Sequence, residues 1–323
     1  MKHFFYILFG GIGAFVIGIS LSLFGGSFFS NVSPKISQFK LSDITNLANV
    51  VVSKPIDGTS ISGIKRTVTY TASEEEGLMT AAMLSLPRTS DAEISSSGYV
   101  IKNLINDKVV AEYQSDRLMP IASLTKLVTA VVSKKLINDS TKIKITNEIV
   151  STFGNTAQLK VGETLQAKDL YYPLLMVSSN DAAEALARSH GRQKFIQAMN
   201  IFVQSIGAYR TTFKDPSGLS PDNLSTANDM VTIFSWIQKN EPEIIEITKL
   251  KTKTIRAHTW TNPTRFLSWS NYLGGKNGYT EEAKQTGVAV FYMGQEKIPH
   301  IITILGSRSR DTDILKLLTK IKL

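Results

Sequence analysis

The order of strand-like and helix-like segments within residues 95–323 constrains the fold of this chain more than any other feature. Apolar runs with many strand-forming residues occur near both ends of this region. The first two runs flank Asn106-Asp107-Lys108, which is a hairpin pattern. These runs are Gly98–Leu104, Val109–Tyr113, Val288–Met293 and Ile301–Leu305. Because helical segments fill the region between them, we expect an α+β (α/β) fold with a central antiparallel sheet.

The longest helical pattern follows Pro120, where apolar residues from Leu124 to Leu136 recur three or four positions apart. Its flanks are almost wholly apolar, so this helix is expected to be buried. Further helices are expected at Leu170–Met176, Ala182–Ala187, Met199–Ile206, Met230–Ile237 and Asp311–Leu323. The chain has no Gly-x-Gly-x-x-Gly and no P-loop sequence, which argues against a doubly wound nucleotide-binding fold.

Residues 1–30 are interpreted as an N-terminal membrane anchor or signal segment. The stretch Phe4–Phe29 has 26 residues without a charge, and about 20 apolar residues span a bilayer as a helix. Its end, Phe24–Phe29, is a poor cleavage site, which favours an uncleaved anchor over a cleaved signal. Lys2 favours a cytoplasmic N-terminus, so the remaining chain would lie outside the cell membrane, or be secreted if the segment is cleaved.

Residues 31–94 differ from the region that follows, because three prolines and many Ser and Thr residues interrupt them. Within them, Ile64–Ala72 could form one strand, since Val and Thr favour strands, and Leu78–Leu86 a short helix. The sequence leaves open whether this segment is a partly ordered spacer or an extension that packs on the domain. The catalytic domain is expected to comprise residues 95–323.

Composition excludes several classes of site. The chain has no cysteine, which rules out disulfides, thiolate metal sites and a cysteine nucleophile, and its four histidines are too scattered to indicate a metal site. The net charge is +9, but the lysines are dispersed. A nucleic-acid site predicts a basic cluster with interleaved aromatic residues. We therefore expect no nucleic-acid partner, and attribute the charge to contact with anionic wall polymers or lipid head groups.

The first catalytic candidate is Ser123-Leu124-Thr125-Lys126, at the start of the buried helix. Residues three apart lie on one face of a helix, so Lys126 can reach the hydroxyl of Ser123. A serine hydroxyl needs a base, and a lysine serves as one when burial lowers its pKa. Two other Ser-x-x-Lys segments occur in the chain, so the alternative is a serine N-cap with a surface lysine.

Two further motifs follow. Ser178-Ser179-Asn180 offers a hydroxyl that can relay a proton and an amide that can hold a peptide carbonyl, although the same residues are also an ordinary helix start. Lys276-Asn277-Gly278 places a positive charge beside a glycine, where a substrate chain can lie close. The alternative for this segment is a polar β-turn.

Taken in this order, 55 and then 98 residues apart, the three motifs resemble those of penicillin-binding proteins and serine β-lactamases. The sequence segments around the motifs are similar to those of the low-molecular-mass D-alanyl-D-alanine carboxypeptidases, the S11 peptidase family, over about residues 95–323. These segments are Pro120–Lys126, Leu175–Ala183, Phe213–Leu219, Ser225–Asp229 and Gly275–Thr280. The resemblance implies a β-lactamase/transpeptidase-like fold, with a helical subdomain that carries the Ser-x-Asn motif.

The resemblance also implies roles for five residues in peptidoglycan metabolism. Ser123 would attack the carbonyl between the last two D-alanines of a stem peptide, and Lys126 would take its proton. Ser178 would relay a proton to the leaving amine, with Lys276 tuning this path. Asn180 would bind the substrate amide.

Substrate binding is expected at Asn277, Gly278, Tyr279 and Thr280, with the backbone N–H groups of Ser123 and Tyr279 forming the oxyanion hole. Water would hydrolyse the acyl-enzyme, and β-lactams would acylate Ser123. The resemblance implies no metal and no organic cofactor.

Two departures from the family pattern concern the third motif and the chain's end. Asn277 stands where the family usually has threonine, which puts substrate preference in doubt. The chain stops at Leu323, without the C-terminal β-domain and amphipathic anchor of many relatives, so the N-terminal segment would do the anchoring. A DD-endopeptidase and a catalytically weak wall-binding protein remain alternatives. A β-lactamase is disfavoured because no Glu-x-x-Leu-Asn segment lies between Ser178 and Lys276.

Overall fold

The computed structural model describes residues 51–52, 68–69, 94–154 and 156–321, which fall in two compact units, Met1–Pro87 and Arg88–Leu323. In the first unit, strand β1 (Val51–Val52) pairs antiparallel with β2 (Val68–Thr69). β2 falls within the predicted strand Ile64–Ala72. The rest of that prediction, the helix expected at Leu78–Leu86 and the stretch Phe4–Phe29 lie outside the described residues.

Among the helices in the described parts of the chain, none is long and apolar enough to cross a membrane. The three-segment division with boundaries at residues 30 and 94 stays a prediction.

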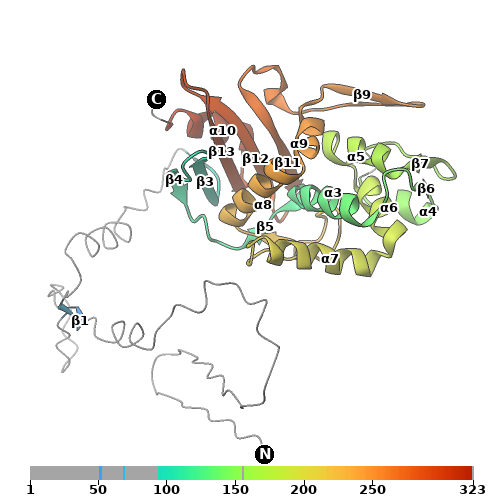
Figure 1. The fold of residues 1–323 in the computed structure, drawn as a ribbon, viewed down its shortest axis with the longest axis horizontal. Helices are drawn as coiled ribbons and strands as arrows, with labels where there is room; N and C mark the ends of the chain where they lie inside the picture. Colours follow the sequence, from blue (N-terminus) through green and yellow to red (C-terminus); the bar gives the residue numbers. More distant parts are fainter. Residues whose placement is uncertain (1–50, 53–67, 70–93, 155, 322–323) are drawn as a thin grey trace, which may run out of the picture. The chain divides into compact units, whose positions relative to one another are not determined.

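A five-stranded antiparallel sheet forms the centre of the second unit, in the order β11-β12-β13-β3-β4 (Figure 1). The strands are β3 (Gly98–Asn103), β4 (Val109–Tyr113), β11 (Tyr272–Thr280), β12 (Lys284–Met293) and β13 (Ile298–Ser307). The predicted hairpin, both late strands and the antiparallel sheet are confirmed. β11 occupies one edge of the sheet and carries Lys276, Asn277 and Gly278, so this segment is a strand and not a turn.

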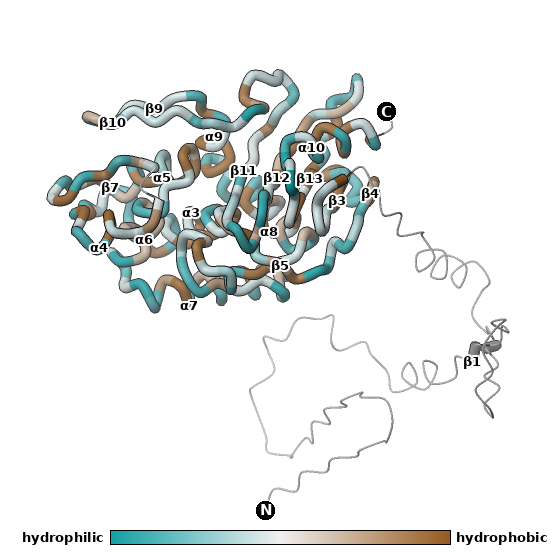
Figure 2. Tube along the Cα trace, turned by 180° about the vertical axis from the view of Figure 1, so that it is seen from behind, coloured by the Kyte–Doolittle hydropathy of each residue, from teal (hydrophilic) through white to brown (hydrophobic). Residues whose placement is uncertain are grey.

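Both faces of the sheet are buried, because apolar side chains alternate along the strands. On β12, Ala289 and Phe291 belong to one apolar cluster, whereas Val288 and Val290 belong to another. Helix α10 (Arg310–Leu318) covers the first face through Ile314 and Leu317, and α8 (Ala227–Asn240) covers the second. Figure 2 shows hydrophobic segments recurring along these strands and helices.

The remaining helices pack with α8 into the apolar cluster that contains Val288 and Val290. They are α3 (Thr125–Leu136, preceded by the 3₁₀ turn η1, Ala122–Leu124), α4 (Asn147–Val150), α5 (Ala167–Met176), α6 (Asn180–His190), α7 (Arg192–Ser205) and α9 (Pro242–Lys249), with the turn η2 (Arg265–Ser268) near β11. α3 is buried along most of its length between the sheet side and α5, α6 and α7, as predicted (Figure 1). The other helix predictions are confirmed, except that α10 ends at Leu318 and not at Leu323. Helix α9 was not predicted from the sequence; it begins with Pro242 at its first position.

Three short antiparallel pairs complete this unit: β5 (Met119–Pro120) with β8 (Leu224–Ser225), β6 (Lys142–Lys144) with β7 (Thr164–Gln166), and β9 (Thr252–Ile255) with β10 (His258–Thr261). The hairpin β9–β10 extends alongside α5 toward β7 (Figure 1). The three sequence motifs lie on η1 and α3, at the start of α6, and on β11.

Candidate active site

The backbone before Ser123 is held in an unusual conformation. Ala122, in η1, has φ of 48°, a left-handed value that costs a non-glycine residue about 1–3 kcal/mol. Two neighbours hold it there. The hydroxyl of Thr286, on β12, donates to the carbonyl of Ile121 at 3.0 Å, and Gly218 lies against the Ala122 carbonyl so closely that any side chain at this glycine would collide with it. The surrounding structure thus fixes the orientation of Ser123.

Lys126 is fully buried and lies one turn along the helix from Ser123. Its Nζ is 2.9 Å from Oγ of Ser123. It also lies 2.7 Å from Oδ1 of Asn180 and 2.5 Å from the carbonyl oxygen of Ser217. The alternative of a surface lysine beside a capping serine is therefore wrong, because burial and three polar partners hold this amine against the hydroxyl.

Burial lowers the pKa of Lys126 to about 7, against an opposing effect from the charge of Asp215. A neutral amine has two N–H groups and one lone pair. The carbonyls of Asn180 and Ser217 accept only, so they take the two N–H groups. The lone pair is then left for the O–H of Ser123, which is the arrangement of a general base beside its nucleophile.

A second lysine and serine form a similar pair. The Nζ of Lys276, on β11, donates to Oγ of Ser178 at 2.9 Å and to the carbonyl of Asn277 at 2.7 Å. Burial lowers the pKa of Lys276 well below its usual range, and the charge of Lys126 acts in the same direction. Ser178 has φ of 59°, a second strained position, just before α6.

The Ser-x-Asn motif is both a helix start and part of the site. Oγ of Ser179 caps α6 by accepting from the N–H of Ala182 at 3.1 Å. Asn180, the first residue of α6, accepts from Lys126 through Oδ1 and donates through Nδ2 to the carbonyl of Phe153 at 2.7 Å. Its side chain is 9 % exposed and fixed at both ends, so the middle residue of the motif shapes the helix while the outer two face the site.

Edge strand β11 approaches the nucleophile at Gly278. A Cβ on this glycine would lie 2.9 Å from the backbone N of Ser123 and 2.5 Å from Oγ1 of Thr286, so no larger residue fits without displacing the strand. Asn277, the residue before it, reaches Oγ1 of Thr264 with its amide at 3.4 Å. The strand therefore lies against the N-terminus of the catalytic helix, beside Ser123.

A pocket of about 700 Å³ opens at these residues. Its lining includes Ser123, Phe153, Thr156, Ser178, Asn180, Gly218, Leu219, Pro263, Asn277, Gly278, Tyr279, Thr280, Glu281, Glu282 and Arg310. Every residue that the sequence assigned to the site is on this list, apart from the buried Lys126 and Lys276. One wall comes from residues 151–154 and 156–163, called the wall loop below.

In the part of the chain that the structure describes, His, Asp and Glu side chains nowhere form a group of three or more that could hold a metal ion.

The comparison with known families agrees with this geometry. Residues 86–308 match the family model of the D-alanyl-D-alanine carboxypeptidases, peptidase family S11. The chain belongs to this family.

Two curated relatives and one solved structure illustrate the similarity of this S11 chain. A D-alanyl-D-alanine endopeptidase of Escherichia coli is 31 % identical over 205 residues, which are 61 % of this chain and 64 % of the relative. The D-alanyl-D-alanine carboxypeptidase DacC of the same organism is 32 % identical over a region that covers 70 % of this chain and 61 % of the length of DacC. This chain thus spans less than two thirds of either relative's length.

A variant of the DD-transpeptidase of Streptomyces K15 has the same fold. It superimposes with a TM-score of 0.64 at 28 % identity, over 70 % of this chain and 97 % of that protein. The β-lactamase/transpeptidase-like fold and the family resemblance expected from the sequence are confirmed.

Several residues of this S11 site were missed by sequence reasoning. Asp215 accepts the backbone N–H groups of Ser217, Gly218 and Ser220 at 2.6 Å each, and so holds the Ser217 carbonyl on Lys126. An Asp-Pro-Ser-Gly turn is the signal that could have indicated this carboxylate. Phe153 and Arg310 line the pocket without a local sequence pattern that marks them.

Proposed function

We propose that this chain is a serine-type D-alanyl-D-alanine carboxypeptidase that acts on peptidoglycan stem peptides. The observation that carries the proposal is the contact between Lys126 and Ser123, in which a buried amine with two fixed acceptors has its lone pair free for the hydroxyl. Family membership and the name of the DacC relative support the same activity.

Acylation uses the two lysine–serine pairs in turn. Oγ of Ser123 attacks the carbonyl of the penultimate D-alanine while Lys126 takes its proton. The backbone N–H groups of Ser123 and Tyr279 receive the developing oxyanion, which Gly278 permits by letting β11 approach the nucleophile. The hydroxyl of Ser178, hydrogen-bonded to Lys276, gives its proton to the leaving amine and receives in exchange the proton that Lys126 took, so the C–N bond breaks, D-alanine leaves and Lys126 is neutral again.

Deacylation then needs water, which attacks the ester on Ser123 and releases the shortened peptide. A β-lactam mimics the peptide bond, but its amine stays tethered after ring opening, and this accounts for covalent inhibition through the same serine.

Substrate binding divides between the two walls of the pocket. The remaining N–H of Asn180 and the backbone of Tyr279 hold the peptide, with Gly278 and Thr280 along the same strand. The substrate's terminal carboxylate requires a cation, and Arg310 is the arginine that lines the pocket. The amide of Asn277 donates where the family usually has a threonine hydroxyl.

A DD-endopeptidase activity is the second candidate, because relatives from Escherichia coli, Haemophilus influenzae and Pseudomonas aeruginosa carry that name at 29–33 % identity. A cross-linked peptide presents the same D-alanyl amide with a larger leaving group. The pocket is open and would admit either substrate.

We also propose that residues 1–30 anchor the chain in the cell membrane, with the catalytic unit outside, because Phe4–Phe29 carries no charge. Fractionation of cells that express the protein tests this: recovery in the soluble fraction with an intact N-terminus would contradict it.

Labelling with a fluorescent penicillin tests the catalytic proposal. We expect covalent labelling of the wild type and none of Ser123→Ala, whereas Ser140→Ala, at an exposed serine, labels normally. Release of D-alanine from a pentapeptide, against cleavage of a purified cross-linked dimer, distinguishes the two activities. An unlabelled but folded wild type would indicate a wall-binding protein without catalysis.

A further inference from the structure

Hairpin β9–β10 contacts the wall loop of the catalytic pocket from outside. The indole N–H of Trp260 donates to the carbonyl of Ala157 at 3.0 Å, one residue after the pocket-lining Thr156. Trp260 is 3 % exposed and Ala157 2 %, so water does not compete for this bond. The hairpin thus fixes the backbone of the wall loop at the edge of the pocket.

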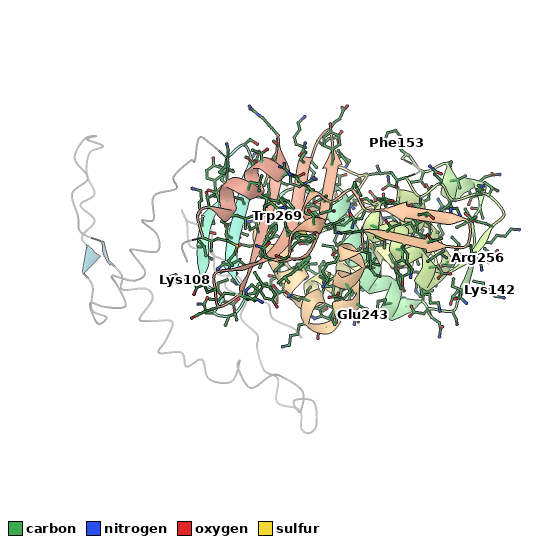
Figure 3. All side chains as sticks on the ribbon, turned by 90° about the horizontal axis from the view of Figure 1, so that it is seen from above. Lys108, Lys142, Phe153, Glu243, Arg256 and Trp269 are labelled. Carbon is green, nitrogen blue, oxygen red and sulfur yellow. The ribbon has the colours of Figure 1, made fainter. Side chains whose placement is uncertain are left out.

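A second contact fixes the far end of the loop. Nε2 of His258 lies 2.8 Å from Oε2 of Glu163, and the imidazole stacks parallel on the indole of Trp260, with ring centroids 5.5 Å apart. At the tip of the hairpin, Arg256 donates to the carbonyl of Thr164, the residue after the loop. Figure 3 labels Arg256 near the end of this hairpin.

The wall loop in turn contacts the catalytic residues. The carbonyl of Phe153 accepts from Nδ2 of Asn180 at 2.7 Å, and Oδ1 of Asn180 accepts from Lys126 at 2.7 Å. The ring of Phe153 is 82 % exposed and points outward (Figure 3), so packing of this side chain does not hold the loop. Its backbone contacts do.

We propose that Trp260 and His258 are positioning residues for the reaction at Ser123. They fix the wall loop, the loop fixes the amide of Asn180, and Asn180 keeps one N–H of Lys126 occupied so that the lone pair of the amine faces the nucleophile. The inference rests on the proposed function, since it concerns the rate at which Ser123 is acylated.

The expected effect is on rate and not on folding. A misplacement of about 1 Å in a catalytic group can cost a large factor in rate, while the loss of one hydrogen bond changes the stability of the fold only modestly. Trp260→Phe keeps the buried ring and removes only the N–H. We expect acylation of the full-length protein by a fluorescent penicillin to slow by about three- to tenfold, with a melting temperature within a few degrees of the wild type.

Trp236→Phe is the matched control, because Trp236 lies on α8 with its ring edge-on to Phe202 and does not line the pocket. This variant should be acylated at the wild-type rate. A double-mutant cycle then separates positioning from a general loss of structure. If Trp260 acts through Asn180, the effect of Trp260→Phe falls below about twofold in an Asn180→Ala background. An equal loss in both backgrounds overturns the proposal.

His258 provides a second, independent pair of variants. His258→Gln keeps a donor for Glu163 and should retain most of the acylation rate, whereas His258→Leu should lose about as much as Trp260→Phe. If folded Trp260→Phe and His258→Leu are acylated at the wild-type rate, this inference is contradicted while the proposed function stands. A wild type that no penicillin acylates would overturn the proposed function, and the inference with it.

Discussion

Nζ of Lys276 lies 2.9 Å from Oγ of Ser178, although 98 residues separate them in the chain. Lys276 is on the edge strand of the sheet and Ser178 on the turn between two helices, so this contact joins the two parts of the catalytic unit. Because the lysine is buried, its amine is present for a purpose other than solubility.

Replacing Lys276 by Met separates catalysis from stability. The variant loses the hydrogen-bond donor beside Ser178, so we expect acylation to slow by about a hundredfold. Burial disfavours the charged amine in the folded state, so Met at this position should leave the melting temperature unchanged or raise it. Lys168→Met, at an exposed lysine on α5, is the control and should change neither property. A variant that is inactive only because it unfolds would contradict the assignment.

The rate of acylation should depend on pH through Lys126. Its pKa of about 7 is lowered by burial, and only the neutral amine can take the proton of Ser123. The rate therefore rises with pH, reaches half of its plateau near pH 7, and is about a hundredfold below the plateau at pH 5. Stopped-flow labelling between pH 5 and pH 9 measures this profile. A flat profile across that range would exclude Lys126 as the base.

Asn277→Thr tests the departure from the family's third motif. The hydroxyl is the group that usually contacts the substrate carboxylate, while the amide of Asn277 reaches toward Thr264. We expect the variant to bind a D-alanyl-D-alanine peptide more tightly, with KM lower by about two- to tenfold and kcat changed less. Steady-state kinetics with a pentapeptide decide this. An increase in KM would show that the asparagine matches this chain's own substrate.

The sequence predicted the elements that carry strong apolar periodicity, such as the helix from Leu124 to Leu136 and the strand Val288–Met293. It also indicated the five candidate catalytic side chains, because these residue types occur at fixed spacings within segments that are typical of the family. The structure brings all of them to one pocket or directly beneath it.

Some features of the site could not be predicted from the sequence, for physical reasons. Ser217 contributes a backbone carbonyl, which every residue has, so no side chain marks it. The hairpin β9–β10 is short and rich in threonine, without the apolar run that marks a buried strand. Arg310 reaches the pocket because Gly287 on β12 leaves room for it, since a Cβ there would lie 2.6 Å from Cδ of the arginine. Because Gly287 is distant from Arg310 in the sequence, no local pattern marks the arginine.

The last prediction concerns Asp215, whose carboxylate acts on Lys126 in two ways. It holds the turn that places the Ser217 carbonyl on the amine, and its negative charge raises the pKa of Lys126 against the larger effect of burial. In Asp215→Asn this charge is absent, so the pKa of Lys126 falls further. The half-maximal point of the acylation profile then moves to lower pH, while the plateau falls because an amide accepts fewer of the turn's N–H groups.

Asp222→Asn is the matched control, since Asp222 is exposed in the same loop and it is its backbone N–H, not its carboxylate, that donates to Oγ of Ser220. Its pH profile should coincide with that of the wild type. Labelling rates of the three proteins across the pH range, measured at low salt and again at high salt, test the charge effect. A midpoint in Asp215→Asn above that of the wild type would contradict it, because removing a negative charge cannot favour the protonated lysine.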